Sequence, residues 1–306
     1  METMRNSSGT ISLMSPIDLQ EGVASLSRGA YFKEASLSMT LSILTESAAQ
    51  MSGIERVSIW ALVEGKHELR CLELFERGAT KHSSGIVLQA SECPIYFQSL
   101  AGRRRSATED ALLLPEMSEL AAGYLAPHKV TARLDTPIHI RGELQGVLSF
   151  EQVGSHLPWT TAHRLFAHAV ANLVTLALVE YEAEEARREA KTATERLRAV
   201  FDASRDALLL ADGESGIILD ANRQAEKLFG CKRHDLVGKD QRMLHPKASA
   251  LKIDDHFRQM ASGQFRGAVL TEIYRSDGSV LPVEITSEIA NTSDGKRLAL
   301  GIFRPI

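Results

Sequence analysis

The sequence has few cysteines, unlike many extracellular proteins, and no excess of basic residues, unlike most nucleic-acid binders. Its 306 residues include only three cysteines, Cys71, Cys93 and Cys231, and no CxxC spacing, which argues against a structural zinc site or a disulfide framework. The net charge of −4 argues against a general nucleic-acid binder, because no large basic field is available to displace counterions. A signal-peptide layout is absent, and the most apolar stretch, 169–179, is too short to span a bilayer. These absences predict a protein of the reducing cytoplasm without a membrane or nucleic-acid partner.

Catalytic signatures are also missing. No GxxxxGK[ST], GxGxxG or HExxH motif occurs, which excludes the common phosphate-cradling loops and zinc peptidase sites. His67-Glu68-Leu69-Arg70 matches the core of a histidine-kinase phosphoacceptor box, but the nucleotide-binding boxes that such a kinase needs are absent. The flanking segments, VSIWALV (57–63) and LRCLELF (69–75), have strand composition. We therefore interpret His67 as a turn residue and expect no catalysis by this chain.

The first half of the chain predicts a sheet flanked by helices. Residues 1–28 have no sustained periodicity and predict a loosely ordered arm. A 4-3-4-3 apolar stripe then predicts a helix; it consists of Leu37, Leu41, Leu44, Ala48 and Met51. Short helices are expected at 94–100 and 117–125, around a solvated loop that contains Arg103, Arg104 and Arg105. Residues 133–154 form the clearest hairpin, turning at Arg141-Gly142-Glu143.

A long helix is predicted after Trp159, because neither glycine nor proline interrupts residues 160–200. Small and apolar residues recur along it at strict heptad spacing. This seam consists of Val179, Ala183, Ala186, Ala190, Ala193, Leu197 and Val200. The helix could pack one face on its own domain. We favour the other interpretation, a parallel coiled coil that joins two domains and two subunits.

The second half predicts another small α+β domain. Residues 206–222 read as a strand, a tight turn at Asp212-Gly213-Glu214, and a second strand. A short helix follows, with Asn222 as its N-cap and Gly230 as its stop. Three further strands are expected at 265–274, 280–289 and 297–303, with Asp277-Gly278 as a hairpin signal and Pro282 near a strand start or an edge.

These motifs together resemble two known domain families. Residues 201–306 resemble a PAS domain, through the DANRQAEKLFG helix, the LVGK turn, the LHP segment and DGSVLPVEI. Residues 29–178 resemble a GAF domain, through the long first helix, Tyr124-Leu125, LDTPIHIRGELQGVLSFEQVG, and the closing helix with Trp159, Phe166 and Ala167. The resemblance implies an α+β fold of two domains. Each is an antiparallel sheet with helices on its faces, and a coiled-coil helix at 179–200 joins them.

The resemblance implies the sensory region of a bacterial signal-transduction protein. Such a region would sense a small molecule or a partner. As a parallel homodimer along helices near 32–51 and 160–204, it would then signal to an output domain outside this chain, a cyclic-di-GMP enzyme or a histidine kinase. The sequence reads Gly301-Ile302-Phe303-Arg304-Pro305-Ile306 where PAS domains usually begin an outgoing helix, so we expect a fragment of a longer protein. The alternatives are a dimerisation scaffold without ligand and a haem or flavin sensor.

Comparison with cofactor-binding PAS domains predicts no tightly bound cofactor and no metal. GKDQRMLH (238–245) resembles the flavin photosensory motif, but Gln241 stands where the reactive cysteine is required. The axial position of the haem sensors falls near Lys252, and His256, one turn later, is expected to be exposed beside Asp254 and Asp255. His245 is interpreted as a loop residue. Candidate pocket residues are Arg242, His256 and Met260 in the PAS half, and Cys71, Tyr96 and Tyr124 in the GAF half.

Overall fold

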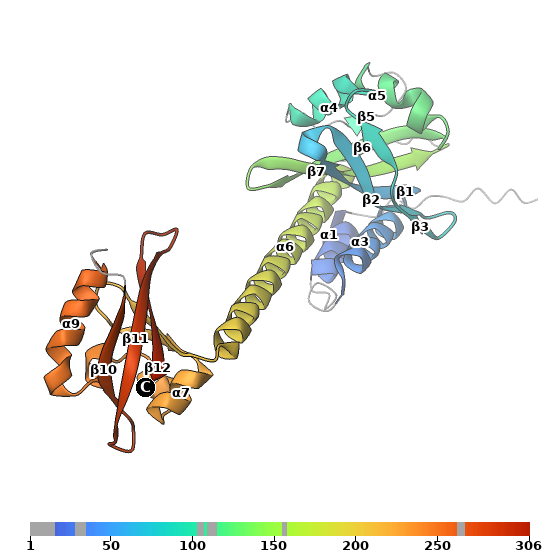
Figure 1. The fold of residues 1–306 in the computed structure, drawn as a ribbon. Helices are drawn as coiled ribbons and strands as arrows, with labels where there is room; N and C mark the ends of the chain where they lie inside the picture. Colours follow the sequence, from blue (N-terminus) through green and yellow to red (C-terminus); the bar gives the residue numbers. More distant parts are fainter. Residues whose placement is uncertain (1–15, 28–34, 103–106, 109–114, 155–157, 262–266) are drawn as a thin grey trace, which may run out of the picture. The chain divides into compact units, whose positions relative to one another are not determined.

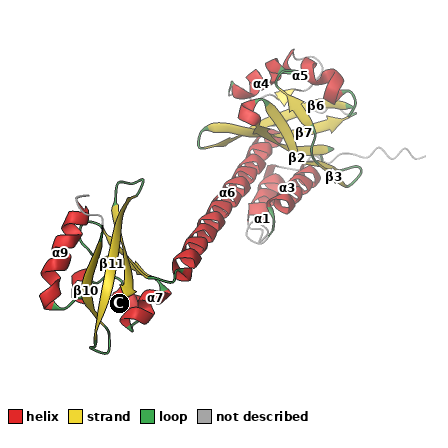
Figure 2. Ribbon diagram, viewed as in Figure 1, coloured by secondary structure: helices red, strands yellow, loops and turns green. Residues whose placement is uncertain are grey.

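The chain folds into two compact units, Met1–Ala186 and Arg187–Ile306, each with a sheet and a core of its own (Figure 1). The structure is a computed structural model that describes residues 16–27, 35–102, 107–108, 115–154, 158–261 and 267–306. The predicted α+β class is confirmed in both units, since each described sheet is antiparallel and carries helices (Figure 2).

The N-terminal unit is built on a sheet whose described strands run in the order β3-β2-β1-β7-β6-β5, with β4 paired to β2. The strands are β1 (Arg56–Val63), β2 (Glu68–Glu76), β3 (Lys81–Ser83), β4 (Val87–Gln89), β5 (Ala107–Thr108), β6 (Val130–Ile140) and β7 (Glu143–Val153). The hairpin predicted over 133–154 is confirmed, and Arg141 and Gly142 adopt the positive φ angles of a tight turn. His67 lies in the turn between β1 and β2, as predicted.

Helices cover both faces of this sheet and enclose two separate cores. One face packs against α1 (Pro16–Ser27), α3 (Leu37–Ser52) and the first part of α6 (Thr161–Ala203). The opposite face packs against α4 (Pro94–Ala101), α5 (Pro115–Leu120) and the helical turn η2 (Ala121–Leu125) (Figure 2). The short helices predicted at 94–100 and 117–125 are thereby confirmed. The predicted loop at Arg103–Arg105 lies outside the described residues.

The structure changes two expectations for the N-terminal helices. The arm predicted for residues 1–28 is helical from Pro16, because Val23 and Leu26 form an apolar edge that packs on the core. The stripe on α3 belongs to the core of its own unit, where Leu41, Leu44 and Ala48 are at most 2% exposed. It is therefore buried against the sheet, and the dimer predicted along this helix would have to use its other face.

The helix α6 is continuous over 43 residues, as the absence of glycine and proline predicted. Its first part is a core element of the N-terminal unit, with Phe166, Val170 and Val174 buried beside the sheet. Among the described helices it is the one long and apolar enough, by length and composition, to cross a membrane. In its most apolar window, however, 44% of the residues are buried inside the protein, as in a core helix.

The C-terminal unit is built on a sheet whose described strands run in the order β10-β11-β12-β8-β9. These strands are β8 (Ala207–Asp212), β9 (Ile218–Ala221), β10 (Ala268–Tyr274), β11 (Val280–Asn291) and β12 (Arg297–Pro305). The helices are α7 (Arg223–Phe229), α8 (Arg233–Leu236), the 3-10 turn η3 (Gln241–Leu244) and α9 (Lys247–Ala261). The predicted order of strands and helices is confirmed, and Pro282 is the third residue of β11, near its start.

Candidate functional site

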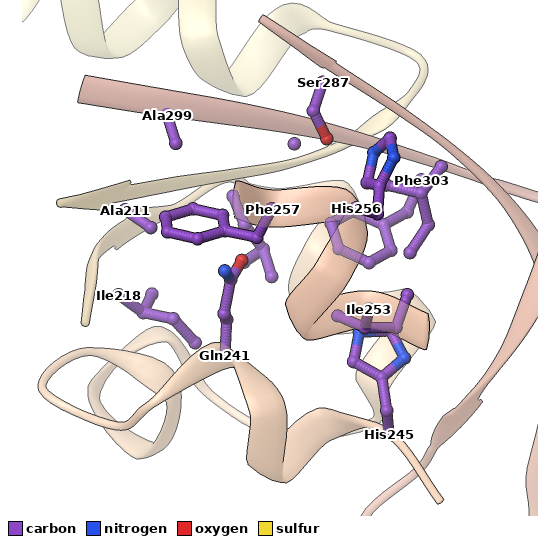
Figure 3. Close-up of a pocket in the computed structure, with 13 residues that line it drawn as sticks. Ala211, Ile218, Gln241, His245, Ile253, His256, Phe257, Ser287, Ala299 and Phe303 are labelled. Carbon is purple, nitrogen blue, oxygen red and sulfur yellow. The ribbon is translucent and has the colours of Figure 1, made fainter. Parts of the chain in front are cut away.

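A small cavity lies inside the C-terminal unit, between the sheet and the segment that carries η3 and α9 (Figure 3). Its volume is about 30 Å³. Strands β8, β11 and β12 supply apolar walls. Four polar side chains also line it, namely those of Gln241, His245, His256 and Ser287.

His245 is the best fixed of these polar groups. Its side chain is 5% exposed, and its Nδ1 lies 2.8 Å from the carbonyl oxygen of Glu272 on β10. This contact requires that Nδ1 carries the proton, since a carbonyl can only accept. The sequence indicated a loop residue at this position. His245 does lie in the loop between η3 and α9, and its imidazole in addition ties this segment to the sheet and lines the cavity.

The structure places one sequence-based candidate, His256, in the wall of this cavity and another, Arg242, outside it. His256 lines it and is 9% exposed, so the expectation of an exposed histidine is wrong. The reason is that α9 turns His256, Ile253 and Phe257 inward, while Asp255 stays in solvent. Arg242 is not among the lining residues, because its exposed guanidinium pairs with Asp240 and Asp254.

The side chain of Met260 lies outside the described residues. Lys252, the position aligned with the haem ligand, is exposed on α9 and donates to the carbonyl oxygen of Leu270. A cavity of about 30 Å³ has room for a water molecule. It has no room for a flavin or a haem, so neither group fits the residues present. In the part of the chain that the structure describes, no group of three or more metal-ligating side chains is placed to hold a metal ion.

Burial of the two histidines makes the stability of the C-terminal unit depend on pH. Burial lowers the pKa of His245 and of His256, whereas the unfolded chain protonates near pH 6.5. The contribution of these histidines to the free energy of unfolding is therefore present in full above about pH 6.5. It declines as the pH falls towards the lowered folded-state pKa values, by at most about 1.4 kcal/mol per pH unit for each histidine.

The free energy of unfolding can be measured by urea titration followed by far-UV circular dichroism. Between pH 7.5 and 5.5 we expect it to fall less in the His245→Gln/His256→Gln double variant than in wild type. An undiminished pH dependence in the double variant would contradict the assignment to these two residues. His163 contributes equally to both proteins, because burial lowers its pKa in the N-terminal unit of each.

A row of alternating charges crosses four strands of the N-terminal sheet. The register pairs Glu76 of β2 with Arg56 of β1, Arg56 with Glu151 of β7, and Glu151 with Arg133 of β6. Arg56 bonds Glu76 at 2.7 Å and Glu151 at 3.0 Å, and Arg133 lies 3.3 Å from Glu151. Arg133 and Glu151 are fully buried. We call this row the charge ladder.

The candidates proposed for the GAF half lie around this ladder. Tyr96 on α4 donates to Asp135 at 2.9 Å, and Tyr124 on η2 donates to Glu151 at 3.1 Å. Both side chains are at most 1% exposed. Cys71 on β2 is in the same core. Burial raises its pKa to about 12, with Glu151 adding to the effect, so it is a neutral thiol.

The predicted heptad seam lies on α6, and all seven of its residues are exposed in the single chain. Leu197 and Val200 are each 73% exposed, the highest values among the large apolar side chains of the described residues. Over the last residues of the seam, α6 is also bonded to the C-terminal unit. Arg198 donates to Asp220 at 2.8 Å and to the carbonyl oxygen of Ala221 at 3.1 Å.

Asn222 is the central polar residue at this end of the C-terminal unit. Its amide nitrogen donates to the carbonyl oxygens of Phe201 and Asp206, at 3.0 and 2.9 Å. Its Oδ1 accepts from the backbone nitrogens of Leu208 and Ala225, at 2.9 and 2.8 Å. The predicted N-cap is thus confirmed, and the same side chain also holds the end of α6 and the start of β8.

Comparison with known proteins adds two domain matches. A family model of the GAF domain matches residues 36–178, and a family model of the PAS domain matches residues 205–306. An uncharacterised protein of Azorhizobium caulinodans is 29% identical over 223 residues, which are 70% of this chain and 29% of that protein. The chain therefore spans under a third of that relative's length.

Solved structures resemble each half separately. The PAS domain of a protein from Colwellia psychrerythraea is 25% identical, with a TM-score of 0.34, and the match covers 38% of this chain and 97% of that one. The GAF domain of a phosphoenolpyruvate-protein phosphotransferase from Coxiella burnetii is 15% identical, with a TM-score of 0.46, and that match covers 56% and 99%.

Proposed function

Because this chain carries a GAF domain at residues 36–178 followed by a PAS domain at 205–306, we propose that it is the sensory region of a signal-transduction protein. In this proposal the chain performs no chemistry. It works in the cytoplasm and passes a change of conformation to an output domain outside residues 1–306, such as a cyclic-di-GMP enzyme or a histidine kinase.

The observation that carries the proposal is the double role of α6. One end of this helix is a core element of the GAF domain, through residues such as Phe166 and Val174. The other end is held to the PAS domain by Arg198 and by the bond from Asn222 to Phe201. A change of packing in the GAF core can move such a helix as a rigid element.

A second copy of the chain is the partner we propose for the exposed seam. Its spacing is that of a two-stranded coiled coil, and its alanines allow close approach of the helices. In a parallel pair, Glu182 at a g position of one helix faces Arg187 at the following e position of the other, so this one flanking pair is complementary in charge. Two chains related in this way would place their domains side by side and would respond as one unit.

A scaffold that dimerises without a ligand is the second candidate. The small size of the PAS cavity, about 30 Å³, favours it, because a metabolite of ordinary size needs a larger site. In the sensory proposal the signal is instead a very small molecule in that cavity, or a protein partner. Both candidates require the dimer.

The dimer is tested by multi-angle light scattering on wild type and on the Ala190→Glu/Leu197→Glu variant. We expect wild type to have twice the chain mass and the variant to be monomeric, because four like charges would meet in the seam. Thr192→Glu/Ala199→Glu is the matched control, since it adds the same charge to α6 away from the seam. A dimeric seam variant, or a monomeric wild type, would contradict both candidates.

A further inference from the structure

The guanidinium of Arg133 is fully enclosed by the N-terminal domain. Its Nε bonds both oxygens of Asp135, at 2.8 and 3.0 Å. Its Nη2 donates to the hydroxyl of Tyr96 at 3.0 Å and to the hydroxyl of Ser149 at 2.9 Å, and Nη1 lies 3.3 Å from Glu151. Nε and Nη2 of the planar cation are therefore hydrogen-bonded, whereas Nη1 faces Glu151 as an ion pair without a hydrogen bond.

Aromatic rings provide the remaining walls. The guanidinium carbon lies 5.4 Å from the ring centres of Tyr96 and Tyr124, and 6.0 Å from that of Trp60. Trp60 and Tyr124 meet edge to face, which fixes the rings relative to each other. Rings around a cation within about 6 Å are the arrangement by which proteins recognise alkylated ammonium and guanidinium groups.

The walls come from rigid elements on both sides of the cation. Asp135, Ser149 and Glu151 project from β6 and β7, and Trp60 projects from β1. The two tyrosines reach in from α4 and η2, and each is fixed by a bond to a buried carboxylate. The oxygens are thus held at their positions by contacts among the walls themselves, in addition to their bonds with Arg133.

We propose that these walls form a recognition site for a guanidinium cation, and that the chain's own Arg133 side chain is its resident ligand. This face of the GAF domain is consequently self-occupied and takes no separate small molecule in the wild-type protein. The assignment holds whether or not the chain is a sensor, so its failure would leave the proposed function standing.

Removal of the tethered cation tests the proposal. In the full chain, Arg133→Ala should leave a site that binds free guanidinium ion. With a Kd of about 1 mM, 10 mM guanidinium chloride would raise the midpoint of thermal unfolding of the variant by about 3 °C, followed by tryptophan fluorescence. Wild type should show no increase, because its site is filled.

Three controls separate recognition from a general effect. Urea has the same planar shape without the charge, and ammonium chloride has the charge without the shape. Arg56→Ala removes the other buried arginine of the charge ladder, whose guanidinium carbon lies over no ring in the described residues. We expect a rise only for Arg133→Ala with guanidinium. No rise, or an equal rise with urea, with ammonium or in Arg56→Ala, would overturn the proposal.

If Arg133→Ala does not fold in buffer, refolding of the variant from urea tests the same proposal. Recovery of native tryptophan fluorescence in 10 mM guanidinium chloride, and not in 10 mM ammonium chloride, would support the proposal. Recovery in neither or in both would overturn it.

Discussion

The Glu151→Ala variant is expected to lose about 3–5 kcal/mol of the free energy of unfolding of the GAF domain. Glu151 lies between two buried cations, with Arg56 at 3.0 Å and Arg133 at 3.3 Å, and it also accepts from Tyr124. Without its carboxylate, two guanidinium groups are left close together in a medium that screens them poorly. Each keeps one carboxylate partner, which limits the loss.

Urea titration followed by tryptophan fluorescence measures this loss in the correct domain. Both tryptophans of the chain, Trp60 and Trp159, belong to the GAF domain. Glu143→Ala is the matched control, because Glu143 is on the same strand but is exposed and pairs with Lys66 in solvent. Its midpoint should not change measurably. A loss below about 1 kcal/mol for Glu151→Ala, typical of surface pairs, would contradict the role of the charge ladder.

The Asn222→Ala variant is expected to destabilise the PAS domain by about 3–4 kcal/mol. Its side chain is fully buried and makes four hydrogen bonds, each with a net value of about 1 kcal/mol, and the loss leaves four backbone groups without their partner. The variant also loses the N-cap of α7. In calorimetry, the transition of the PAS domain should move to lower temperature, while the transition seen by tryptophan fluorescence stays in place.

Asn172→Ala supplies the control for Asn222. Asn172 is exposed on α6, and its replacement should leave both transitions unchanged. If Asn222→Ala lowered the two transitions equally, the residue would not be specific to the PAS domain. If Asn222→Ala changed neither transition temperature, the four hydrogen bonds would contribute no net free energy to stability.

Local signals in the sequence predicted most elements of the fold. The hairpin at 133–154, the N-cap at Asn222 and the stop at Gly230 all follow from residues within a few positions of each other. The helix at 160–200 follows from the absence of glycine and proline. Contacts between neighbours along the chain determine such features, so a single sequence contains them.

The charge ladder could not be predicted in this way. In Arg133-Leu134-Asp135 the alternation of charged and apolar residues is that of a strand with one wet face. Here the charged face is covered by α4, α5 and η2, and the charges are paired across strands that are distant in sequence. The burial of His245 and His256 has the same origin, because the strands that cover them, β8 before them and β10 to β12 after them, are distant in the sequence. The available hint was a pair of opposite charges two residues apart within a strand.

The first and last strands of the PAS domain are neighbours, and this has a consequence for how such domains are combined in evolution. Strand β12 pairs with β8, and Arg304 bonds both carboxylate oxygens of Asp206, at 3.1 and 2.7 Å. The chain therefore enters and leaves the domain at nearly the same place. A module with this property can be duplicated, inserted or removed while the segments on either side keep their paths, which makes it a unit that genomes can shuffle.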